Sequence, residues 1–347
     1  MKNQRYYNNF ENLNKKSILI TGGTGSFGKL FVKKVLKWFN PKKIVVFSRD
    51  EHKQYELEKE LVELGYKDFR FFIGDVRDCE RLKLALRNIE IVIHAAALKH
   101  VPSAEYNPFE CIHTNIIGAQ NIVTASIYSG VKKVIALSTD KACSPLNLYG
   151  ASKLASDKIF VAANHLSEKN GCKFSVVRYG NVVNSRGSVI SLYYELIKKK
   201  SKYLPITDRK MTRFWITLEQ GIDFVLSSLD YMAGGEIFIP KIPSMKIIDL
   251  ANVMAPSIPQ KVIGIRPGEK LHEVMITEDD ARYTSELKDR YIIFPSFNNW
   301  SRQLNSVSRY GKLIVRKKMP EGFRYSSDLN SEWLDKQKFD KILKYES

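Results

Sequence analysis

The sequence predicts an α/β protein: a doubly wound parallel β-sheet with helices on both faces, followed by a smaller C-terminal lobe. In the first half of the chain, short apolar runs rich in Val and Ile alternate with segments of helical spacing. A glycine-rich turn separates the first apolar run from the first helical segment. After about Asn181 the regular alternation stops, and helical stretches mix with short strands and prolines.

The individual elements follow from periodicity and length. Continuous apolar runs of four or five residues predict strands that are buried on both faces of a parallel sheet. We expect these strands at 17–21, 43–47, 69–73, 91–94, 133–137 and 174–178. We expect helices between them at 27–39, 51–64, 79–86, 108–129 and 148–166, and in the second half at 188–200, 218–229 and 247–254.

Composition narrows the class of protein. The chain has 347 residues, of which 44% are hydrophobic, and no apolar run long enough to span a membrane. The net charge of +18 comes from dispersed lysines without a nucleic-acid-binding signature, so we expect a basic surface that attracts an anionic substrate. Four isolated cysteines and six histidines show no metal-ligand spacing. These features predict a cytoplasmic protein that binds no metal, membrane or nucleic acid.

The segment Thr21-Gly-Gly-Thr-Gly-Ser-Phe-Gly28 follows the first expected strand. Gly22 permits a tight turn, Gly25 lets the backbone approach a pyrophosphate at the helix N-terminus, and Gly28 lets the helix pack closely on the strand. A strand before it and a helix after it favour a Rossmann-type dinucleotide site over an ordinary turn. The expected cofactor contacts in this segment are Gly22, Thr24, Gly25, Ser26, Phe27 and Gly28.

The end of the second strand bears on the choice of cofactor. NAD enzymes usually place an acidic residue here, whereas Ser48 and Arg49 suit the 2′-phosphate of NADP. Asp50 follows and could instead open the next helix, as could Glu51, and Lys53 lies close enough to join the site. We therefore expect NADP.

Three further strand ends contribute to the expected cofactor site. Asp75 and Val76 follow the third strand, where they can meet the adenine or cap the next helix. The small side chains of Ala95 and Ala97 follow the fourth strand, where they either leave room for a cofactor or serve packing. Lys99 lies just beyond, within reach of a ribose or of the substrate.

The fifth strand leads into residues that suit alcohol oxidation. Tyr149 and Lys153 are four residues apart and share one face of a helix. An ammonium near the phenol lowers its pKa, so that the phenol can accept a proton while hydride leaves for the nicotinamide. The Thr139 hydroxyl can bond the same substrate oxygen.

Asp140 and Lys141 stand between these groups, and oxidation alone does not need them. Oxidising a sugar C4 hydroxyl acidifies the C5 proton, which a base can then remove while an acid helps the C6 hydroxyl leave. Such a 4,6-dehydration would use Lys141 as a base with a pKa depressed by burial, by Lys153 and by the nicotinamide. A salt bridge or cap at the strand end explains the pair equally well from the residues alone.

Several motifs together resemble one family, the inverting UDP-N-acetylglucosamine 4,6-dehydratases of the extended short-chain dehydrogenase/reductase type. The motifs are Thr21 to Gly28, Ser48-Arg-Asp-Glu51, Phe72-Ile-Gly-Asp-Val-Arg-Asp78, His94-Ala-Ala-Ala-Leu-Lys-His-Val-Pro102, Ser138-Thr-Asp-Lys-Ala142, Arg178-Tyr-Gly-Asn-Val182, Pro205-Ile-Thr-Asp208, Met211-Thr-Arg-Phe-Trp215 and Ile265-Arg-Pro-Gly-Glu-Lys-Leu-His-Glu273. The resemblance runs from about Ser17 to Met275. It departs at Asn184, where the family pattern has Gly.

The resemblance implies tightly held NADP, UDP-N-acetylglucosamine as substrate and a 5-epimerising dehydration on the route to pseudaminic acid or a related glycan. It assigns Asp140 and Lys141 to acid–base steps, and Tyr149 and Lys153 to C4 oxidation. It places the nucleotide sugar against Lys99, Asn181, Thr207, Arg213, Arg266 and Glu269. Arg213 and Arg266 are also plausible phosphate clamps by charge, or plain surface arginines.

Three regions are expected: a flexible extension (1–16), an NADP-binding domain (17–181) and a mainly substrate-binding lobe (182–347) that returns some chain to the sheet. A homo-oligomer is expected. The alternatives are a UDP-sugar 4-epimerase, which needs no Asp140–Lys141 pair, and a non-catalytic NADP-binding protein, which would not need Tyr149 or Lys153.

Overall fold

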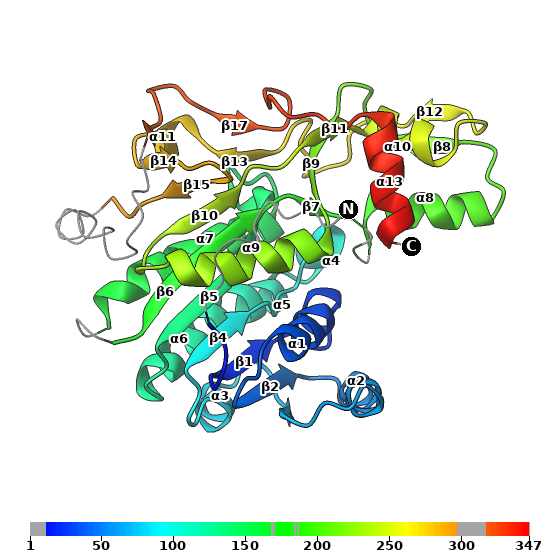
Figure 1. Cartoon of the computed structure of the whole chain (residues 1–347). Coiled ribbons are helices and arrows are strands. Elements are labelled where there is room, and N and C mark those ends of the chain that lie inside the picture. Colours follow the sequence, from blue (N-terminus) through cyan, green and yellow to red (C-terminus); the bar gives the residue numbers. More distant parts are fainter. Residues whose placement is uncertain (1–11, 168–170, 184, 186, 297–316, 347) are drawn as a thin grey trace.

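A parallel β-sheet forms the centre of the protein. The structure, a computed structural model, describes residues 12–167, 171–183, 185, 187–296 and 317–346. Within these residues the main sheet has the strand order β16-β14-β15-β10-β6-β5-β4-β1-β2-β3. The seven strands from β3 to β10 run parallel, and β15, β14 and β16 extend the sheet antiparallel. The predicted doubly wound parallel sheet is confirmed (Figure 1).

Six of the seven parallel strands agree closely with the sequence predictions, whereas β10 was not predicted. All of them except β3 are mostly buried, because helices cover both faces of the sheet. β3 lies at the edge of the sheet and is buried only at Phe69, so the expected burial on both faces is wrong for this strand. Their bounds are β1 (Ser17–Thr21), β2 (Lys43–Ser48), β3 (Phe69–Ile73), β4 (Ile91–His94), β5 (Lys133–Thr139), β6 (Lys173–Tyr179) and β10 (Ile237–Pro240).

Helices cover both faces of this sheet. On one face α1 packs against α9, and ion pairs from Lys29 and Lys33 link α1 to α2. On the other face α6 packs against α3 and α7. Figure 1 shows α1 and α9 in front of the sheet. The bounds are α1 (Ser26–Trp38), α2 (Glu51–Glu63), α3 (Cys79–Ala85), α6 (Gly118–Tyr128), α7 (Leu148–Ala162) and α9 (Leu218–Tyr231).

The helix expected at 108–129 is interrupted. It consists of α5 (Pro108–Ile112), the π-helix η1 (His113–Ile117) and α6, and it is preceded by a short helix α4 (Val101–Tyr106) that was not predicted. A π-turn inserts one extra residue, and this change of period is invisible to a search for 3.6-residue spacing. Asn115 in the π-turn accepts a hydrogen bond from the Leu98 amide (2.8 Å) and donates one to Ser152 Oγ (2.9 Å). The insertion therefore ties the loop after β4 to α7.

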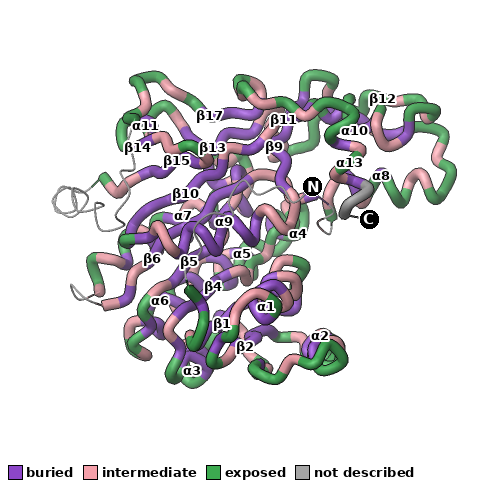
Figure 2. Tube along the Cα trace, viewed as in Figure 1, coloured by how far each residue is buried: buried purple, intermediate pink, exposed green. Residues whose placement is uncertain are grey.

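The C-terminal half builds a smaller lobe with a separate core. Its elements are β7 (Asn181–Val182), α8 (Val189–Lys198), β8 (Leu204–Ile206), β9 (Thr212–Ile216), β11 (Ser244–Lys246), α10 (Ile247–Met254), β12 (Gln260–Val262) and α13 (Lys336–Glu346). Trp215 and Phe339 pack edge to face at the centre of this core. Figure 2 shows the buried segments of the sheet and of this lobe, each with an exposed periphery.

The chain beyond Thr277, for which the sequence indicates no structure, is ordered where the structure describes it. It forms α11 (Glu278–Ala281), β14 (Thr284–Glu286), β15 (Arg290–Ile293), β16 (Lys317–Lys318) and β17 (Tyr325–Ser326). β17 pairs with β13 (Val274–Ile276), so the end of the chain lies beside the segment that precedes β13.

The start of the chain, as far as it is described, packs on the sheet. Leu13 is fully buried in the main core, and the Lys16 ammonium pairs with Glu90 at 2.9 Å. No helix in the described part of the chain has both the length and the apolar character that a membrane crossing requires.

Candidate active site

The carboxyl ends of the parallel strands form one edge, where open α/β sheets bind ligands. The glycine turn lies at the end of β1. Gly22 has φ +64°, and a Cβ there would stand 3.0 Å from the Ala96 backbone. A Cβ on Gly28 would come within 2.4 Å of Gly23 Cα, so the helix start packs directly on the turn. Both glycines have the steric role that the sequence predicted.

The N-terminus of α1 is free to hold an anion. Its N-cap is Gly25, no side chain caps it, and its first turn carries no acidic residue. Ser26 and Gly25 are exposed there, whereas Thr24 is buried and Phe27 is half-buried. Free N–H groups and the helix dipole favour a phosphate at this position.

The end of β2 presents an exposed cation, Arg49. Ser48 is buried and its hydroxyl accepts a hydrogen bond from Gln54 at 2.9 Å. Asp50 caps α2 by accepting a hydrogen bond from the Lys53 amide (3.0 Å), and it also pairs with the Lys53 ammonium. Of the two roles left open for Asp50, the structure shows the helix cap. The side chain of Arg49 is 58% exposed and its guanidinium lies 3.8 Å from Asp75.

The prediction that Asp75 and Val76 could cap the next helix is wrong, because α3 begins at Cys79. Asp78 caps it by accepting from the Arg81 amide (2.9 Å). Asp75 instead accepts hydrogen bonds from the Arg77 amide and guanidinium. Val76 packs over Gly118, where a Cβ would stand 2.9 Å from Val76 Cγ2.

The loop after β4 passes beside the glycine turn. The Thr21 hydroxyl accepts from the Ala95 and Ala96 amides, both at 3.2 Å. Ala95 is half-buried, whereas Ala97 and Lys99 are exposed. The loop therefore borders the cofactor edge.

The catalytic candidates meet where β5 passes through a 3₁₀ turn, η2 (Asp140–Ala142), into α7. The Thr139 hydroxyl donates to Asp140 Oδ1 at 2.9 Å and also interacts with the buried phenol of Tyr149. The first turn of α7 packs on η2 so closely that a Cβ on Gly150 would stand 2.3 Å from the Lys141 carbonyl oxygen. Gly150 thus fixes Tyr149 beside Lys141, a steric requirement that the sequence analysis missed.

A second carboxylate completes this cluster. The Lys141 ammonium lies 3.1 Å from Asp140 Oδ1 and 3.1 Å from Glu273 Oε1. Asp140 and Glu273 are almost completely buried, whereas the Lys141 side chain is 27% exposed. Glu273 precedes β13 and is 132 residues from Lys141 along the chain.

The expected depression of the Lys141 pKa is wrong. Burial does act to lower the pKa of this ammonium, but the carboxylates of Asp140 and Glu273 outweigh burial and raise it. Burial and the Glu273 carboxylate raise the pKa of Asp140 as well. In the free protein, Lys141 is therefore an ammonium and Asp140 is easily protonated.

The expected lowering of the Tyr149 pKa is also wrong. Burial raises the pKa of the phenol to about 12, against the smaller lowering effects of Lys141 and Thr139. Lys153 lies on the same helix face but donates to the Leu137 carbonyl at 2.7 Å, and burial lowers the pKa of Lys153. In the free protein the cation that acts on the phenol is thus Lys141.

The residues expected to hold the substrate surround the cluster at different depths. Arg213 in β9 is buried, and its guanidinium donates to backbone carbonyls of Thr212, Leu271 and Lys270. Asn181 carries a buried Oδ1 atom that accepts no hydrogen bond from any residue that the structure describes. Thr207 donates to the Met211 sulfur at 3.0 Å.

Arg266 and Glu269 lie in a loop that contacts α7. Their side chains pair at 2.7 Å, and that of Arg266 is 66% exposed. Gly268 takes φ +75° in this turn, and its carbonyl accepts from the N-cap of α7, Asn147, at 2.8 Å. The loop therefore lies at the rim of the cluster, next to Tyr149. The departure at Asn184 lies outside the described residues.

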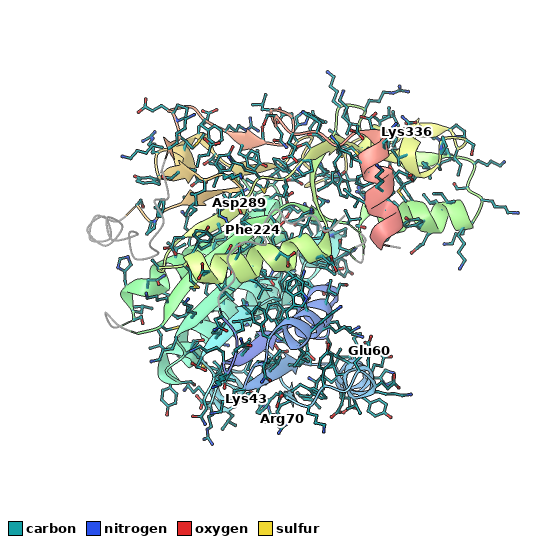
Figure 3. The ribbon with its side chains drawn as sticks, in the orientation of Figure 1. Lys43, Glu60, Arg70, Phe224, Asp289 and Lys336 are labelled. Carbon is teal, nitrogen blue, oxygen red and sulfur yellow. The ribbon has the colours of Figure 1, made fainter. Side chains whose placement is uncertain are left out.

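A cavity of about 300 Å³ lies at the opposite edge, where the strands begin. Lys43 in β2 and Arg70 in β3, which are labelled at the bottom of Figure 3, line it together with Ser17, Lys42, Asp68 and Asn88. Parallel sheets bind their ligands at the carboxyl ends of the strands, and none of the predicted site residues lines this cavity. We therefore assign the chemistry to the cluster around Lys141.

These features define a class of protein. A parallel sheet with a glycine turn after its first strand, and with Thr, Tyr and Lys where the fifth strand meets the next helix, is the extended short-chain dehydrogenase/reductase fold. A sequence profile of the polysaccharide biosynthesis protein family matches residues 18–295. The chain belongs to this family.

Relatives within the family narrow the comparison. The chain is 55% identical over 338 residues to a UDP-N-acetylglucosamine 4,6-dehydratase (inverting) of Campylobacter jejuni, with 96% of this chain and 98% of the relative covered. It is 40% identical over 285 residues to a UDP-glucose 4-epimerase of Rickettsia bellii, with 80% and 82% covered. The crystal structure of Pen from Bacillus thuringiensis superposes with a TM-score of 0.84 at 35% identity, with 96% and 100% covered. The resemblance to the inverting dehydratases is confirmed.

Proposed function

We propose that the protein removes water from UDP-N-acetylglucosamine and inverts C5, giving UDP-2-acetamido-2,6-dideoxy-β-L-arabino-hex-4-ulose. The observation that carries this proposal is the contact of Lys141 with Asp140 directly beside Thr139 and Tyr149. Oxidation of an alcohol needs only the hydroxyl, the phenol and Lys153. An additional buried acid and an ammonium supply the proton transfers that an elimination requires.

The cofactor that fits is NADP. Gly22 and Gly28 make a turn that a Cβ would fill, and the uncapped start of α1 suits a pyrophosphate. With Asp50 engaged as a helix cap, the exposed guanidinium of Arg49, which pairs with Asp75 at 3.8 Å, is the cation that we assign to a 2′-phosphate at the end of β2. Asp75, Val76, Ala95, Ala97 and Lys99 would border the rest of the cofactor. When bound, the nicotinamide supplies a hydride acceptor for C4–H and returns that hydride to C6.

Three side chains, those of Tyr149, Asp140 and Lys141, carry out the proton transfers. Tyr149, positioned by Thr139 and supported by Lys153, must act as the phenolate, which the Lys141 ammonium favours; it then takes the C4 hydroxyl proton, so that C4 becomes a ketone and C5–H becomes acidic. Asp140, whose pKa burial and Glu273 raise, donates a proton to the C6 hydroxyl, which leaves as water, and the Asp140 carboxylate formed in this way accepts the proton lost from C5. Inversion then requires a proton on the other face of C5, which we assign to the Lys141 ammonium beside Asp140; the proton that Tyr149 took from the C4 hydroxyl then restores Lys141. One water leaves, and no net oxidation or reduction results.

The substrate proposal rests on the residues around the cluster. Arg213 and Arg266 offer guanidinium groups to the diphosphate, and Glu269 lies beside both. The unpartnered Oδ1 of Asn181 and the hydroxyl of Thr207 are available for polar contacts with the sugar. Residues 17–181 would then hold the cofactor and 182–347 mainly the nucleotide sugar.

We further propose that the enzyme works in the cytoplasm as a homo-oligomer and that its product feeds pseudaminic acid or a related surface glycan. Four free cysteines are compatible with a reducing compartment. The L-configured 4-keto-6-deoxy sugar is the reactive ketone that a later amination or reduction step would need.

Product analysis in D₂O tests the proposal. With protiated UDP-N-acetylglucosamine, an early NMR spectrum should show deuterium at C5, the substrate's own C4 hydrogen at C6, and an L-configured ring. D-configuration at C5 in the early product would indicate a retaining enzyme. Formation of the C4 epimer without loss of water would indicate an epimerase, the activity named for the Rickettsia relative.

A further inference from the structure

Glu273 is fixed in the site from two directions. It is 1% exposed, and its amide donates to Ser327 Oγ at 2.9 Å while its carbonyl accepts from the Ser327 amide at 2.8 Å. Ser327 follows β17, and its hydroxyl also bonds with that of Thr212 in β9 at 2.6 Å. The backbone of Glu273 is therefore held by the C-terminal chain, independently of its carboxylate.

The carboxylate faces three cations. Glu273 Oε1 lies 3.1 Å from Lys141 Nζ and 3.7 Å from Arg213 Nε, and Oε2 lies 3.7 Å from Lys270 Nζ. Arg213 and Lys270 also donate to backbone carbonyls, Lys270 to that of Cys143. These two cations therefore hold Glu273 in place without depending on it for their own hydrogen bonds.

Lys141 has a different relation to Glu273. Every ion pair found for Lys141 within the described residues is with Asp140 or Glu273. Glu273 Oε2 and Asp140 Oδ2 are buried and accept no hydrogen bond in the described structure. Apolar residues of similar volume are often as stabilising as a buried ion pair, so this arrangement is not the one that stability alone favours.

We propose that Glu273 is a positioning residue for the dehydration: its buried carboxylate holds the Lys141 ammonium against Asp140, so that both groups face the substrate in the geometry that elimination requires. This proposal rests on the proposed function. Glu273 acts through Lys141 and Asp140 and takes no part in C4 oxidation, which belongs to Thr139 and Tyr149.

The charge of Glu273 determines in which direction its removal shifts the pKa values of Lys141 and Asp140. A neighbouring anion raises the pKa of both Lys141 and Asp140, so its removal lowers both. Arg213 and Lys270, which face the same carboxylate, then remain as uncompensated positive charges and lower the two pKa values further. Because Asp140 and Lys141 act as proton donors, the alkaline limb of the kcat profile should move to lower pH.

The test compares E273Q, E273D and the control E236Q. Glu236 is also buried, accepts from Ser175 Oγ at 2.7 Å, and lies before β10, on the far side of β6 from the cluster. For each variant, the absorbance at 340 nm after mixing with UDP-N-acetylglucosamine reports C4 oxidation, and NMR reports product and C5 deuterium. The wild type is assayed first, so that absence of the 4-keto-6-deoxy product there refutes the proposed function and not the role of Glu273.

For E273Q we expect kcat to fall by about 10²-fold, as when a positioned acid or base is lost, while the rise at 340 nm persists. We expect its alkaline limb to move down by about one pH unit, the size of shift that one nearby charge produces. E273D keeps the negative charge but has a shorter side chain. Its kcat should fall by about 10-fold, because a misplacement near 1 Å already slows catalysis, while the alkaline limb of its kcat profile should stay at the wild-type pH. E236Q should retain the wild-type limb.

Two results would overturn the proposal. One is an E273Q variant with wild-type kcat and pH profile. The other is an E273Q variant in which kcat and the rise at 340 nm fall equally while the alkaline limb of the kcat profile stays in place, as a structural defect would cause. If E273Q does not fold by circular dichroism, E273D decides, and wild-type turnover in E273D refutes the role. A second readout does not depend on activity. In protein whose lysines carry ¹³C-methyl groups from reductive methylation, the Lys141 signal is the one that is absent in K141R. Its NMR titration should give a lower Lys141 pKa in E273Q than in the wild type.

Discussion

Replacing Gly150 with Ala should disturb the active site through the backbone. The added Cβ would stand 2.3 Å from the Lys141 carbonyl oxygen and 3.0 Å from Pro145 Cβ, whereas ordinary contacts begin at 3.4 Å. The obstacle is backbone and not a flexible side chain, so η2 and α7 must separate by about 1 Å, which can cost about 10²-fold in rate. Overpacking of this kind destabilises a protein by about 1–3 kcal/mol.

The matched control is Gly221→Ala. Gly221 lies inside α9, and apart from its chain neighbours and the backbone of its own helix no atom of the described residues lies within 4 Å of its added Cβ. Ala is the better helix former, so this variant should gain up to about 1 kcal/mol and keep its turnover. Urea unfolding followed by circular dichroism measures stability without assuming any activity, and product NMR measures turnover. Gly150→Ala with wild-type stability and turnover would show that η2 does not depend on the close approach of α7.

Three further predictions test other parts of the structure. Lys141→Ala should fold and retain cofactor but lose about 10²- to 10⁴-fold in dehydration, the range for a positioned acid or base, and wild-type product formation would make the residue structural. The purified protein should release NADP on denaturation, and Arg49→Glu should weaken NADP binding in a calorimetric titration; release of NAD, or binding of NADP unaffected by the change, would contradict the assignment. Asp223→Ala should lower the free energy of unfolding by about 3 kcal/mol, because it leaves the buried Lys34 ammonium, now 2.6 Å from that carboxylate, without its anion. The double variant Lys34→Met with Asp223→Leu should recover most of this loss in the same urea assay, and a double variant as unstable as Asp223→Ala would refute the explanation.

The first half of the fold was predictable because its signals are local. Strands β1, β3 and β4 have the predicted bounds, since an apolar run bounded by turn residues marks a buried strand without reference to the rest of the chain. The π-turn at His113–Ile117 and the short strands after Thr277 were not predicted. A π-turn changes the helical period, and strands of two or three residues are too short to show alternation. Their stability comes from partners distant in sequence, such as the pairing of β17 with β13.

The site was predictable to the extent that it is contiguous in sequence. The glycine turn and the spacing of Tyr149 and Lys153 are short patterns with a steric or chemical reason, and the structure places them at the expected strand ends. The pKa directions of Lys141 and Tyr149 were wrong, because they depend on burial and on Glu273. Nothing near Lys141 in the sequence indicates that a carboxylate 132 residues away will lie 3.1 Å from it.

The arrangement also suggests how one fold serves different reactions. The groups for C4 oxidation, Thr139 and Tyr149, lie on β5 and α7, which are contiguous in the chain and held together by Gly150. The groups proposed for elimination depend on a longer path, because Lys141 is held by Glu273, and Glu273 by Ser327 at the end of the chain. A change confined to the C-terminal chain could therefore remove elimination while leaving the oxidation step intact. For this reason a relative with the same strand order and the same Tyr and Lys does not by itself reveal the reaction; the carboxylate that faces Lys141 is the feature to compare.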